Sequence, residues 1–327
     1  MSLASTRPVL LVDAYNLFTR HFIANPAMSN HGNHVGGTVG FLKSVGRLAD
    51  MLNPIDICVV WEGGGSLRRR AIYSNYKQKS RPQKLNRFYG DDIPDTVENR
   101  SHQIALTVEL LKTVPVKQIY VSDCEADDVI AYLAKNKYSD NRCVIVSSDK
   151  DYYQLLSNRI VQWSPGQKDF VTAKDVISKF GMYPENFLVA RCFCGDGSDA
   201  LPGIKGAGFK TMLKRFPELA NRDFISVGDI VKLSHERSMT TGKKIKLFHN
   251  INDDPEIAHR NWKLMYLGIS NLAADQIQKV EGIVDTFSCD GNKIKLMKAL
   301  IREGLSTFDA DSFYMSISST LGVGSNQ

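Results

Sequence analysis

Short apolar runs alternate with longer segments of helical period over the first half of the chain. The apolar runs predict five strands, at residues 9–12, 55–61, 116–121, 143–146 and 160–163. Apolar residues at helical spacing predict helices between them, at residues 39–52, at 96–113 and from residue 125. Strands separated by helices predict an α/β fold with a mainly parallel sheet that helices cover on both faces.

The pattern becomes mainly helical after about residue 172. Thr172 is a typical N-cap for a helix to Phe180, and Pro184 opens another helix to about Cys194. A glycine-rich segment at 195–208 separates that helix from the next, which runs through Lys214. We therefore predict an α/β core over 1–180, a helical lobe over 181–310 and a loose tail over 311–327.

The composition is that of a folded globular protein. The chain has 327 residues, of which 43% are hydrophobic and 23% charged, enough to bury a core without disulfides. Its apolar runs fall short of the roughly 18 residues of a membrane helix, and its N-terminus lacks a secretory apolar stretch. Six irregularly spaced cysteines do not form a disulfide framework. We therefore expect a cytoplasmic protein that does not contact a membrane.

Acidic residues follow four of the predicted strands. In open parallel sheets, ligands bind outside the carboxyl ends of the strands, so these acids are expected to meet at one edge. Crowded carboxylates repel one another, and oxygen ligands suit Mg²⁺ or Mn²⁺. The number of acids favours two ions, an arrangement used for phosphoryl cleavage. Acids that merely cap helices or solvate loops would explain one such position, but less well four. The residues are Asp13, Glu62, Glu125, Asp127, Asp128, Asp149 and Asp151.

A further acidic pair lies in the glycine-rich segment. Asp196 and Asp199 are three residues apart in Gly195–Asp199. Their carboxylates either complete a metal site at the same sheet edge or serve as ordinary turn residues. The pair alone does not distinguish these two roles.

Positive charge concentrates in one segment, although the net charge of the whole chain is only +6. Residues 63–90 contain no Asp or Glu, and they interleave eight cations with aromatic residues. Cations bind phosphates and aromatic rings stack on bases, so the segment predicts a path for single-stranded nucleic acid. The alternative is a solvated charged loop. The candidate binding residues here are Arg69, Arg70, Tyr76, Lys77, Lys79 and Arg81.

Three glycines near residue 205 predict a phosphate-binding hairpin. Their backbone N–H groups are able to approach a phosphate, with the next helix N-terminus pointing at it. This is the logic of a helix-hairpin-helix clamp on duplex DNA, and it matches neither the dinucleotide fingerprint nor a Walker loop. The candidate residues are Gly203, Lys205, Gly206, Gly208 and Lys210.

In chain order these motifs resemble the 5′-nuclease superfamily. They are E-A-D-D at 125–128, S-D-K-D at 148–151 and G-D-x-x-D-x-L-P-G-x-K-G-x-G at 195–208. The superfamily includes flap endonucleases, the 5′-nuclease domain of DNA polymerase I and phage 5′-exonucleases such as the T-even phage RNase H. The resemblance implies a PIN-like α/β fold, a helix-hairpin-helix element at about 184–216 and two Mg²⁺ or Mn²⁺ ions. By match of motif, the first ion would be held by Asp13, Glu62, Glu125 and Asp127, with Asp128 close behind. The second would be held by Asp149, Asp151, Asp196 and Asp199.

The resemblance also implies roles for the basic residues. Lys77 and Arg81 would match a catalytic basic pair at the base of an arch or clamp near residues 68–100, and a K⁺ ion would bind hairpin carbonyls. Two departures stand out. Glu62 occupies a position where the family usually has Asp, and the segment from Lys77 to Arg81 is one residue longer than usual. Either Lys79 or Arg81 therefore takes the second basic role.

The predicted function is that of a structure-dependent 5′→3′ exonuclease or flap endonuclease in replication or repair. Its substrates would be branched or nicked duplex DNA with a 5′ end or flap, and RNA–DNA hybrids, giving 5′-phosphate products. It would act as a monomer in the cytoplasm of a bacterial cell or of a phage-infected host. Two alternatives stay open: a catalytically silent DNA-binding member of the fold, and a PIN-type ribonuclease.

Overall fold

The computed structural model describes residues 7–78, 97–240, 245–289 and 291–320. Its centre is one six-stranded sheet in the order β3-β2-β1-β4-β5-β6. All neighbouring strands run parallel except β6, which pairs antiparallel with β5. The predicted α/β fold with a mainly parallel sheet is therefore confirmed. The strands are β1 (Val9–Asp13), β2 (Asp56–Trp61), β3 (Lys117–Tyr120), β4 (Cys143–Val146), β5 (Ile160–Ser164) and β6 (Asp169–Val171).

Helices connect and cover the strands. The longest helix in the described part of the chain, α2, ends at Leu52, and its C-cap Asn53, with a left-handed backbone (φ 44°), precedes Pro54. The apolar pattern did not predict α1, which follows β1 without a separating loop. Asp13 ends β1 and is also the N-cap of α1, where it accepts a hydrogen bond from the Asn16 N–H. Those connected with the sheet in the first half of the chain are α1 (Ala14–Ala24), α2 (Gly36–Leu52), α3 (Leu67–Ile72), α4 (Val97–Leu111) and α5 (Ala126–Tyr132).

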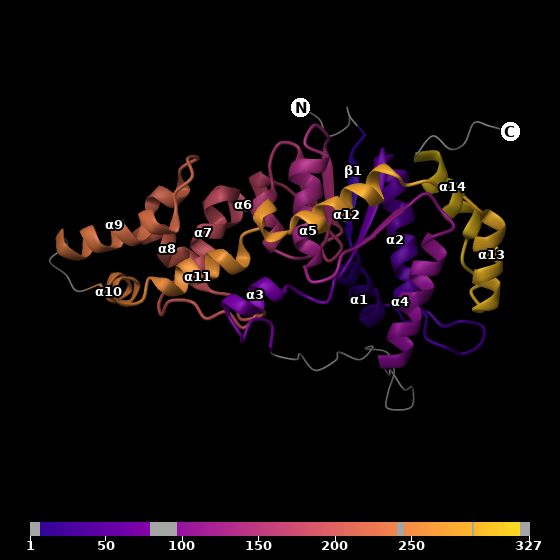
Figure 1. Ribbon diagram of the computed structural model, residues 1–327, viewed down its shortest axis with the longest axis horizontal. Coiled ribbons are helices and arrows are strands. Elements are labelled where there is room, and N and C mark those ends of the chain that lie inside the picture. The colour runs from indigo at the N-terminus through magenta and orange to yellow at the C-terminus, as the bar shows by residue number, and fades with distance from the viewer. Residues whose placement is uncertain (1–6, 79–96, 241–244, 290, 321–327) are drawn as a thin grey trace.

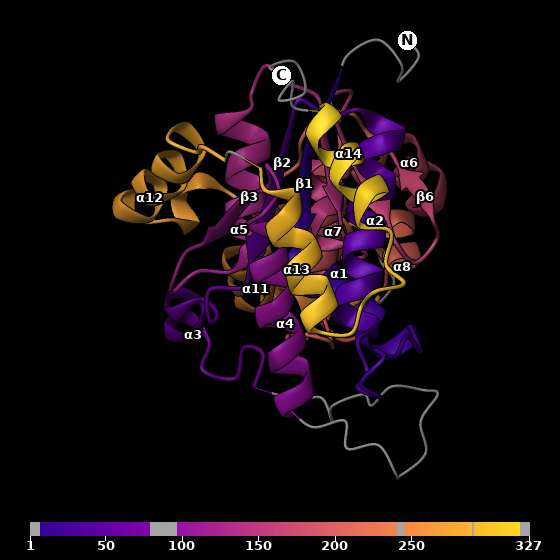
Figure 2. The ribbon, with the colours of Figure 1, turned by 90° about the vertical axis from the view of Figure 1, so that its right-hand side faces the viewer.

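The sheet is buried on both faces. Leu10 and Val12 of β1 point into one apolar core with α1, α2 and α4, whereas Val9 and Leu11 point into another with α5. Figure 2 shows α2 on one side of the strands and α5 on the other. This two-sided burial explains why the strands read as short continuous apolar runs.

A third apolar core lies beside the sheet, in the helical lobe at the left of Figure 1. Phe187 stacks on Phe209 there, with ring centroids 5.1 Å apart. Thr172 caps the first helix as predicted, exchanging hydrogen bonds with Asp175 in a capping box. The helices of the lobe are α6 (Ala173–Phe180), α7 (Pro184–Cys194), α8 (Phe209–Arg215), α9 (Val227–Thr240), α10 (Lys246–Asp253) and α11 (Glu256–Met265).

The last three helices pack into the apolar cores that flank the sheet. We had expected this part of the chain to belong to the helical lobe over 181–310 and to a loose tail over 311–327. They are α12 (Ala274–Asp285), α13 (Lys293–Arg302) and α14 (Ala310–Thr320). Val280 of α12 packs in the core on the α5 side, and Leu296 and Phe313 pack in the core around α2. Figure 1 places α13 and α14 at the end of the molecule opposite the helical lobe. The expectation of a loose tail is wrong up to residue 320, and residues 321–327 lie outside the described part.

Ile317 tests whether α14 belongs to the core. Its side chain is 0% exposed, so Ile317→Val is expected to lower the free energy of unfolding by about 1 kcal/mol through the lost methylene. Denaturant unfolding measures this. Met315 lies on the same helix at 60% exposure, so Met315→Ala should change stability by less than about 0.5 kcal/mol. Equal effects of the two substitutions would contradict the packing of α14.

No helix among the described residues is both long enough and apolar enough to cross a membrane.

Candidate active site

The predicted acids gather at the carboxyl edge of the sheet, around its switch point. The chain builds outward from β1 through β2 to β3 and then returns to place β4 on the other side of β1. Asp13 therefore ends β1 beside Asp149, which follows β4. Such a switch point is where open α/β sheets bind their ligands. We call Asp13, Glu62, Glu125 and Asp127 the first acidic group, and Asp149, Asp151, Asp196 and Asp199 the second acidic group.

Asp13 is held rigidly in the first acidic group. One oxygen accepts a hydrogen bond from the Asn16 N–H at 3.1 Å. The other accepts from the hydroxyls of Ser147 at 3.0 Å and Tyr152 at 3.3 Å. Burial raises the pKa of the Asp13 carboxyl to about 6, and the nearby charge of Asp149 adds to this shift. A cation near this carboxylate would remove that penalty.

Glu125 lies at the cationic side of the same group. Its Oε2 atom accepts hydrogen bonds from the Tyr76 hydroxyl at 3.0 Å and from Lys77 Nζ at 2.8 Å. Its buried side chain also lies 3.2 Å from a nitrogen of Arg69. Glu62 is tied to the loop after β2, where its Oε1 atom accepts from the Gly65 N–H at 3.1 Å. Gly65, Tyr76 and Lys77 of the basic segment are thus hydrogen-bonded to acids of the first acidic group.

The second acidic group brings three aspartates together. Carboxylate oxygens of Asp151, Asp196 and Asp199 lie within 4.8 Å of one another. Burial raises the pKa of Asp199 to about 6 and that of Asp151 well above its ordinary value. Asp196 has a lowered pKa in spite of its burial, because Ser198 donates hydrogen bonds to it and Arg191 lies beside it. The turn residues of 195–199 thus join the sheet-edge acids, as the metal-site interpretation expected.

Two buried oxygens indicate that the acids suit a cation. Asp127 Oδ1 and Asp151 Oδ1 are shielded from solvent and accept no hydrogen bond from the described residues, although Arg69 lies 3.9 Å from the first and Arg191 2.8 Å from the second. An unpartnered buried carboxylate oxygen is costly unless a cation neutralises it. Oxygen-only donor sets of this kind suit Mg²⁺ or Mn²⁺. The residues present therefore fit a divalent ion.

Asp128 does not fit the role of a metal ligand. It is 1% exposed, and its two oxygens accept a bidentate pair of hydrogen bonds from Arg69. Asn271 donates a further bond at 2.7 Å to the same carboxylate. Asp128 is therefore satisfied without an ion, which corrects the prediction that it binds one.

Arg69 and Tyr76 are corrected as well. Both were expected to contact DNA, but they are 1% and 5% exposed and point into the acids. The Arg69 Nε–H also donates to the Leu264 carbonyl at 2.7 Å, which joins α3 to the end of α11. They position the acidic groups and are too buried to contact phosphate. Arg70 is exposed and donates to the Gly64 carbonyl at 2.7 Å, whereas Lys79 and Arg81 lie outside the described residues.

The glycine hairpin joins α7 to α8, as the sequence predicted. Gly206 has φ +89°, and a Cβ at Gly203 would collide with the Cys194 carbonyl, so both positions need glycine. Lys205 and Lys210 are exposed, and Gly208 is the N-cap of α8. The hairpin is tied to α10 because Asn250 donates to the Lys205 carbonyl at 2.8 Å.

Sequence reasoning missed three residues that shape the site. Arg191 contacts Asp151 and Asp196, Tyr152 donates to Asp13, and Asn271 holds Asp128. Arg191 had a weak local signal, since it lies in the last turn of the predicted helix shortly before Asp196. Asn271 had none, because its contact depends on how the chain returns to the sheet.

The raised pKa values predict how stability depends on pH when no divalent ion is bound. Folded Asp13 and Asp199 keep protons up to about pH 6, whereas in the unfolded chain both titrate near 3.8. The folded state therefore binds more protons in this window, and the free energy of unfolding falls as pH rises through it. Thermal unfolding in EDTA should show this fall, and Asp13→Asn should flatten it. A slope equally steep in the variant would contradict the assignment to Asp13.

Known proteins resemble this chain in sequence. A family model described as the 5'-3' exonuclease, N-terminal resolvase-like domain, matches residues 8–181. The 5'-3' exonuclease of Aquifex aeolicus is 32% identical over 221 residues, covering 66% of this chain and 72% of that protein. The thermostable DNA polymerase I of Thermus thermophilus is 33% identical over 212 residues, covering 64% of this chain. The match spans only 24% of the length of that polymerase.

Solved structures share the fold. The bacteriophage T5 flap endonuclease, in a complex with DNA and metal ions, has a TM-score of 0.68 at 20% identity, covering 85% of this chain and 98% of that one. The catalytic core of Rad2 in complex with DNA substrate has a TM-score of 0.55 at 15% identity, covering 97% and 95%. At these identities the likeness establishes the fold alone. The family model, however, matches more than half of the residues and includes both strands that meet at the switch point, so this chain belongs to the 5'-3' exonuclease family.

Proposed function

We propose that the protein is a metal-dependent 5′→3′ exonuclease or flap endonuclease that cleaves phosphodiesters of DNA. The observation that carries the proposal is the gathering of two acidic groups at one sheet edge, with buried carboxylate oxygens that accept no hydrogen bond and with Lys77 beside them. A catalytically silent DNA-binding protein would have no use for so many crowded carboxylates. Membership of a nuclease family supports the same conclusion.

The first acidic group would hold one divalent ion and the second acidic group another. Such ions, when bound, supply a water of lowered pKa and neutralise charge on the phosphate. The carboxylates would hold and orient the ions, and they would not attack the phosphodiester themselves. The products would carry 5′-phosphate and 3′-hydroxyl ends.

Lys77 is the cation best placed to meet the substrate. Its Nζ atom lies 2.8 Å from Glu125, yet 43% of the side chain is exposed. Its backbone N–H donates to the Asp199 carbonyl at 3.0 Å, so one residue links both acidic groups. We propose that the Lys77 ammonium stabilises the charge that develops on the scissile phosphate. Arg81 or Lys79 would assist it.

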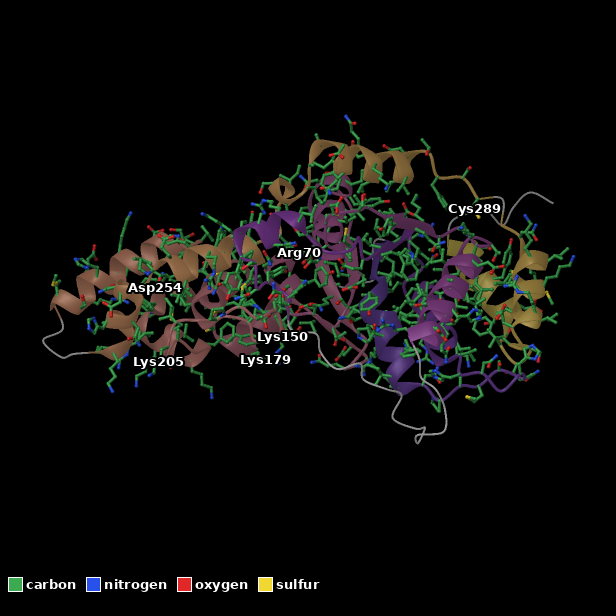
Figure 3. All side chains as sticks on the ribbon, turned by 60° about the horizontal axis from the view of Figure 1, so that its bottom comes forward. Arg70, Lys150, Lys179, Lys205, Asp254 and Cys289 are labelled. Carbon is green, nitrogen blue, oxygen red and sulfur yellow. The ribbon has the colours of Figure 1, made fainter. Side chains whose placement is uncertain are left out.

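Exposed lysines suggest where duplex DNA would lie. Lys150 is between two acids of the second acidic group, Lys179 is in the last turn of α6 and Lys205 is in the glycine hairpin, and all three are exposed. Figure 3 shows them along the same side of the view, from the helical lobe toward the sheet. We propose that phosphates follow this line, with Gly203, Gly206, Gly208 and Lys210 gripping the duplex and a K⁺ ion at the hairpin carbonyls. Arg70 would contact the strand nearer the acids.

The finer parts of the proposal concern substrate and setting. Branched or nicked DNA with a 5′ end or flap is the proposed substrate, together with RNA–DNA hybrids at primers. The proposal comprises an α/β core, an arch near 68–100, of which residues 79–96 lie outside the described part, and a helical DNA-binding element at about 184–216. The protein would act as a monomer in replication or repair, in the cytoplasm of a bacterial cell or of a phage-infected host. Its similarity to bacterial exonucleases and polymerases supports this setting.

One cleavage assay distinguishes the candidate functions. A 5′-flap duplex, a nicked duplex and a single-stranded RNA are each incubated with the protein in Mg²⁺ or in EDTA. We expect cleavage of the two DNA substrates in Mg²⁺ and none in EDTA. Cleavage of the RNA alone would favour a PIN-type ribonuclease. Binding to DNA without cleavage in either Mg²⁺ or Mn²⁺ would favour the silent alternative.

A further inference from the structure

The buried guanidinium of Arg191 lies within the second acidic group. Arg191 is in the last turn of α7, and 11% of its side chain is exposed. One of its terminal nitrogens donates a hydrogen bond to Asp196 and lies 2.8 Å from Asp151 Oδ1. Both carboxylates are 12% exposed, so this contact is poorly screened by water. Asp151 comes from the end of the sheet and Asp196 from the glycine-rich turn, so Arg191 joins two separate segments.

The contact with Asp151 is a charge contact without a hydrogen bond. Asp151 Oδ1 has no hydrogen-bond partner among the described residues, although the guanidinium nitrogen is close. The Nε of Arg191 is likewise buried without a partner. The arginine thus partly neutralises the charge of Asp151 without donating a hydrogen bond to its Oδ1 atom. A residue placed only to satisfy hydrogen bonds would not leave the Asp151 Oδ1 atom and its own Nε–H without a hydrogen bond.

Asp196 does not depend on Arg191 for its orientation. Ser198 donates to Asp196 Oδ1 through its backbone N–H at 2.8 Å and through its hydroxyl. Asp151 is held at the start of a 3₁₀ turn over Asp151–Leu155, where its N–H donates to Asp149 at 2.9 Å. Removing the charge of Arg191 would therefore leave the carboxylates in place, but with their mutual repulsion uncompensated.

We infer that Arg191 is a built-in counter-ion of the second acidic group. It holds Asp151 and Asp196 together when no divalent ion is bound, and it lowers the affinity of the group for a divalent ion. This inference rests on the proposed metal-dependent function. A divalent ion at these oxygens meets carboxylates that are already partly neutralised, so its affinity is lower than the acids alone would give. In return, the site stays assembled at low concentrations of free divalent ion. Arg191 is thus a positioning residue, and it need not touch the substrate.

The test compares Arg191→Met, which keeps the length of the side chain but removes its charge, with Arg191→Lys, which keeps the charge. Binding of Mn²⁺ alone is measured by calorimetry, and thermal unfolding is measured in EDTA and in saturating Mn²⁺. In Arg191→Met, one Mn²⁺ dissociation constant should fall at least about tenfold while the other stays within about twofold. The rise in Tm caused by Mn²⁺ should also exceed that of wild type by at least about 3 °C. Arg191→Lys should stay close to wild type in both measurements.

Arg237→Met is the matched control. Arg237 is 27% exposed and pairs with Glu218 in the helical lobe, so its loss should lower Tm equally with and without Mn²⁺. Unchanged or weaker Mn²⁺ binding in Arg191→Met would overturn the inference. If that variant folds only with Mn²⁺, the counter-ion role is supported. If it does not fold at all, Arg191→Lys decides: Mn²⁺ constants near wild type support the role, and tenfold changes overturn it.

Results that contradict the proposed function can be distinguished from results that contradict only the inference about Arg191. A wild-type protein that binds no Mn²⁺ and cleaves none of the DNA substrates would remove both the function and the inference. A wild-type protein that binds and cleaves, with no change of affinity in Arg191→Met, would remove the inference alone.

Discussion

Asp149→Asn and Asp199→Asn are each expected to reduce cleavage of a 5′-flap duplex in Mg²⁺ by at least about a thousandfold. Each substitution replaces a carboxylate of the second acidic group, which we propose holds a divalent ion, by a neutral amide of the same shape. Asp199 shares a cluster with Asp151 and Asp196 inside 4.8 Å, and Asp149 raises the pKa of Asp13 across the switch point. Single-turnover cleavage measures the loss, and fluorescence anisotropy measures DNA affinity. The affinity should change little, because the basic surface is untouched.

Asp123→Asn is the matched control for these variants. Asp123 is an exposed carboxylate just after β3, close in sequence to the acids, but it belongs to neither acidic group. Its left-handed backbone (φ 62°) tolerates asparagine well. This variant should cleave like wild type. Full activity of both Asp149→Asn and Asp199→Asn in Mg²⁺ would sink the two-ion proposal.

Lys77→Ala is expected to lower the single-turnover rate about a hundredfold while changing DNA affinity only a few-fold. The reason is position: Lys77 Nζ lies 2.8 Å from Glu125, at the acids, yet remains open to a substrate. A cation at that place acts on the charge of the reacting phosphate more than on the rest of the bound strand. The fold should survive, because Arg69 and Tyr76 still contact Glu125.

The contrast with Lys205→Ala makes this test specific. Lys205 is an exposed cation of the hairpin that belongs to neither acidic group, and its loss should weaken DNA affinity and leave the cleavage rate of the bound substrate nearly unchanged. If Lys77→Ala, like Lys205→Ala, lowers the DNA affinity and leaves the single-turnover rate unchanged, Lys77 anchors a phosphate and takes no part in the chemical step.

The strands and the sheet-edge acids were readable from the sequence because both depend on local order. An apolar run that ends in an acid predicts a buried strand with a carboxylate at its end, and parallel strands bring those ends to one edge. This is why Asp13 and Asp149 could be predicted to meet, although 135 residues lie between them. The helix boundaries at Thr172 and Pro184 were readable for the same reason, since capping is a local interaction.

The basic segment shows where a pattern of charge stops being informative. Arg69 and Arg70 are neighbours of the same type, yet Arg69 is 1% exposed and holds Asp128, while Arg70 is exposed. Which of two adjacent cations points inward depends on the packing of α3 against α11. Charge alone therefore predicted a binding role for a residue that stabilises the site from within.

The sequence by itself determined the α/β class, the order of the main elements and the set of acids at the sheet edge. Only the tertiary structure decided that Arg69 removes Asp128 from that set, that Arg191 joins Asp151 to Asp196, and that α14 closes the core beside α2. The physical reason is the distance along the sequence over which each kind of interaction acts. Periodicity, capping and strand ends act between residues a few positions apart, whereas buried ion pairs and returning helices depend on which distant segments share a common interior.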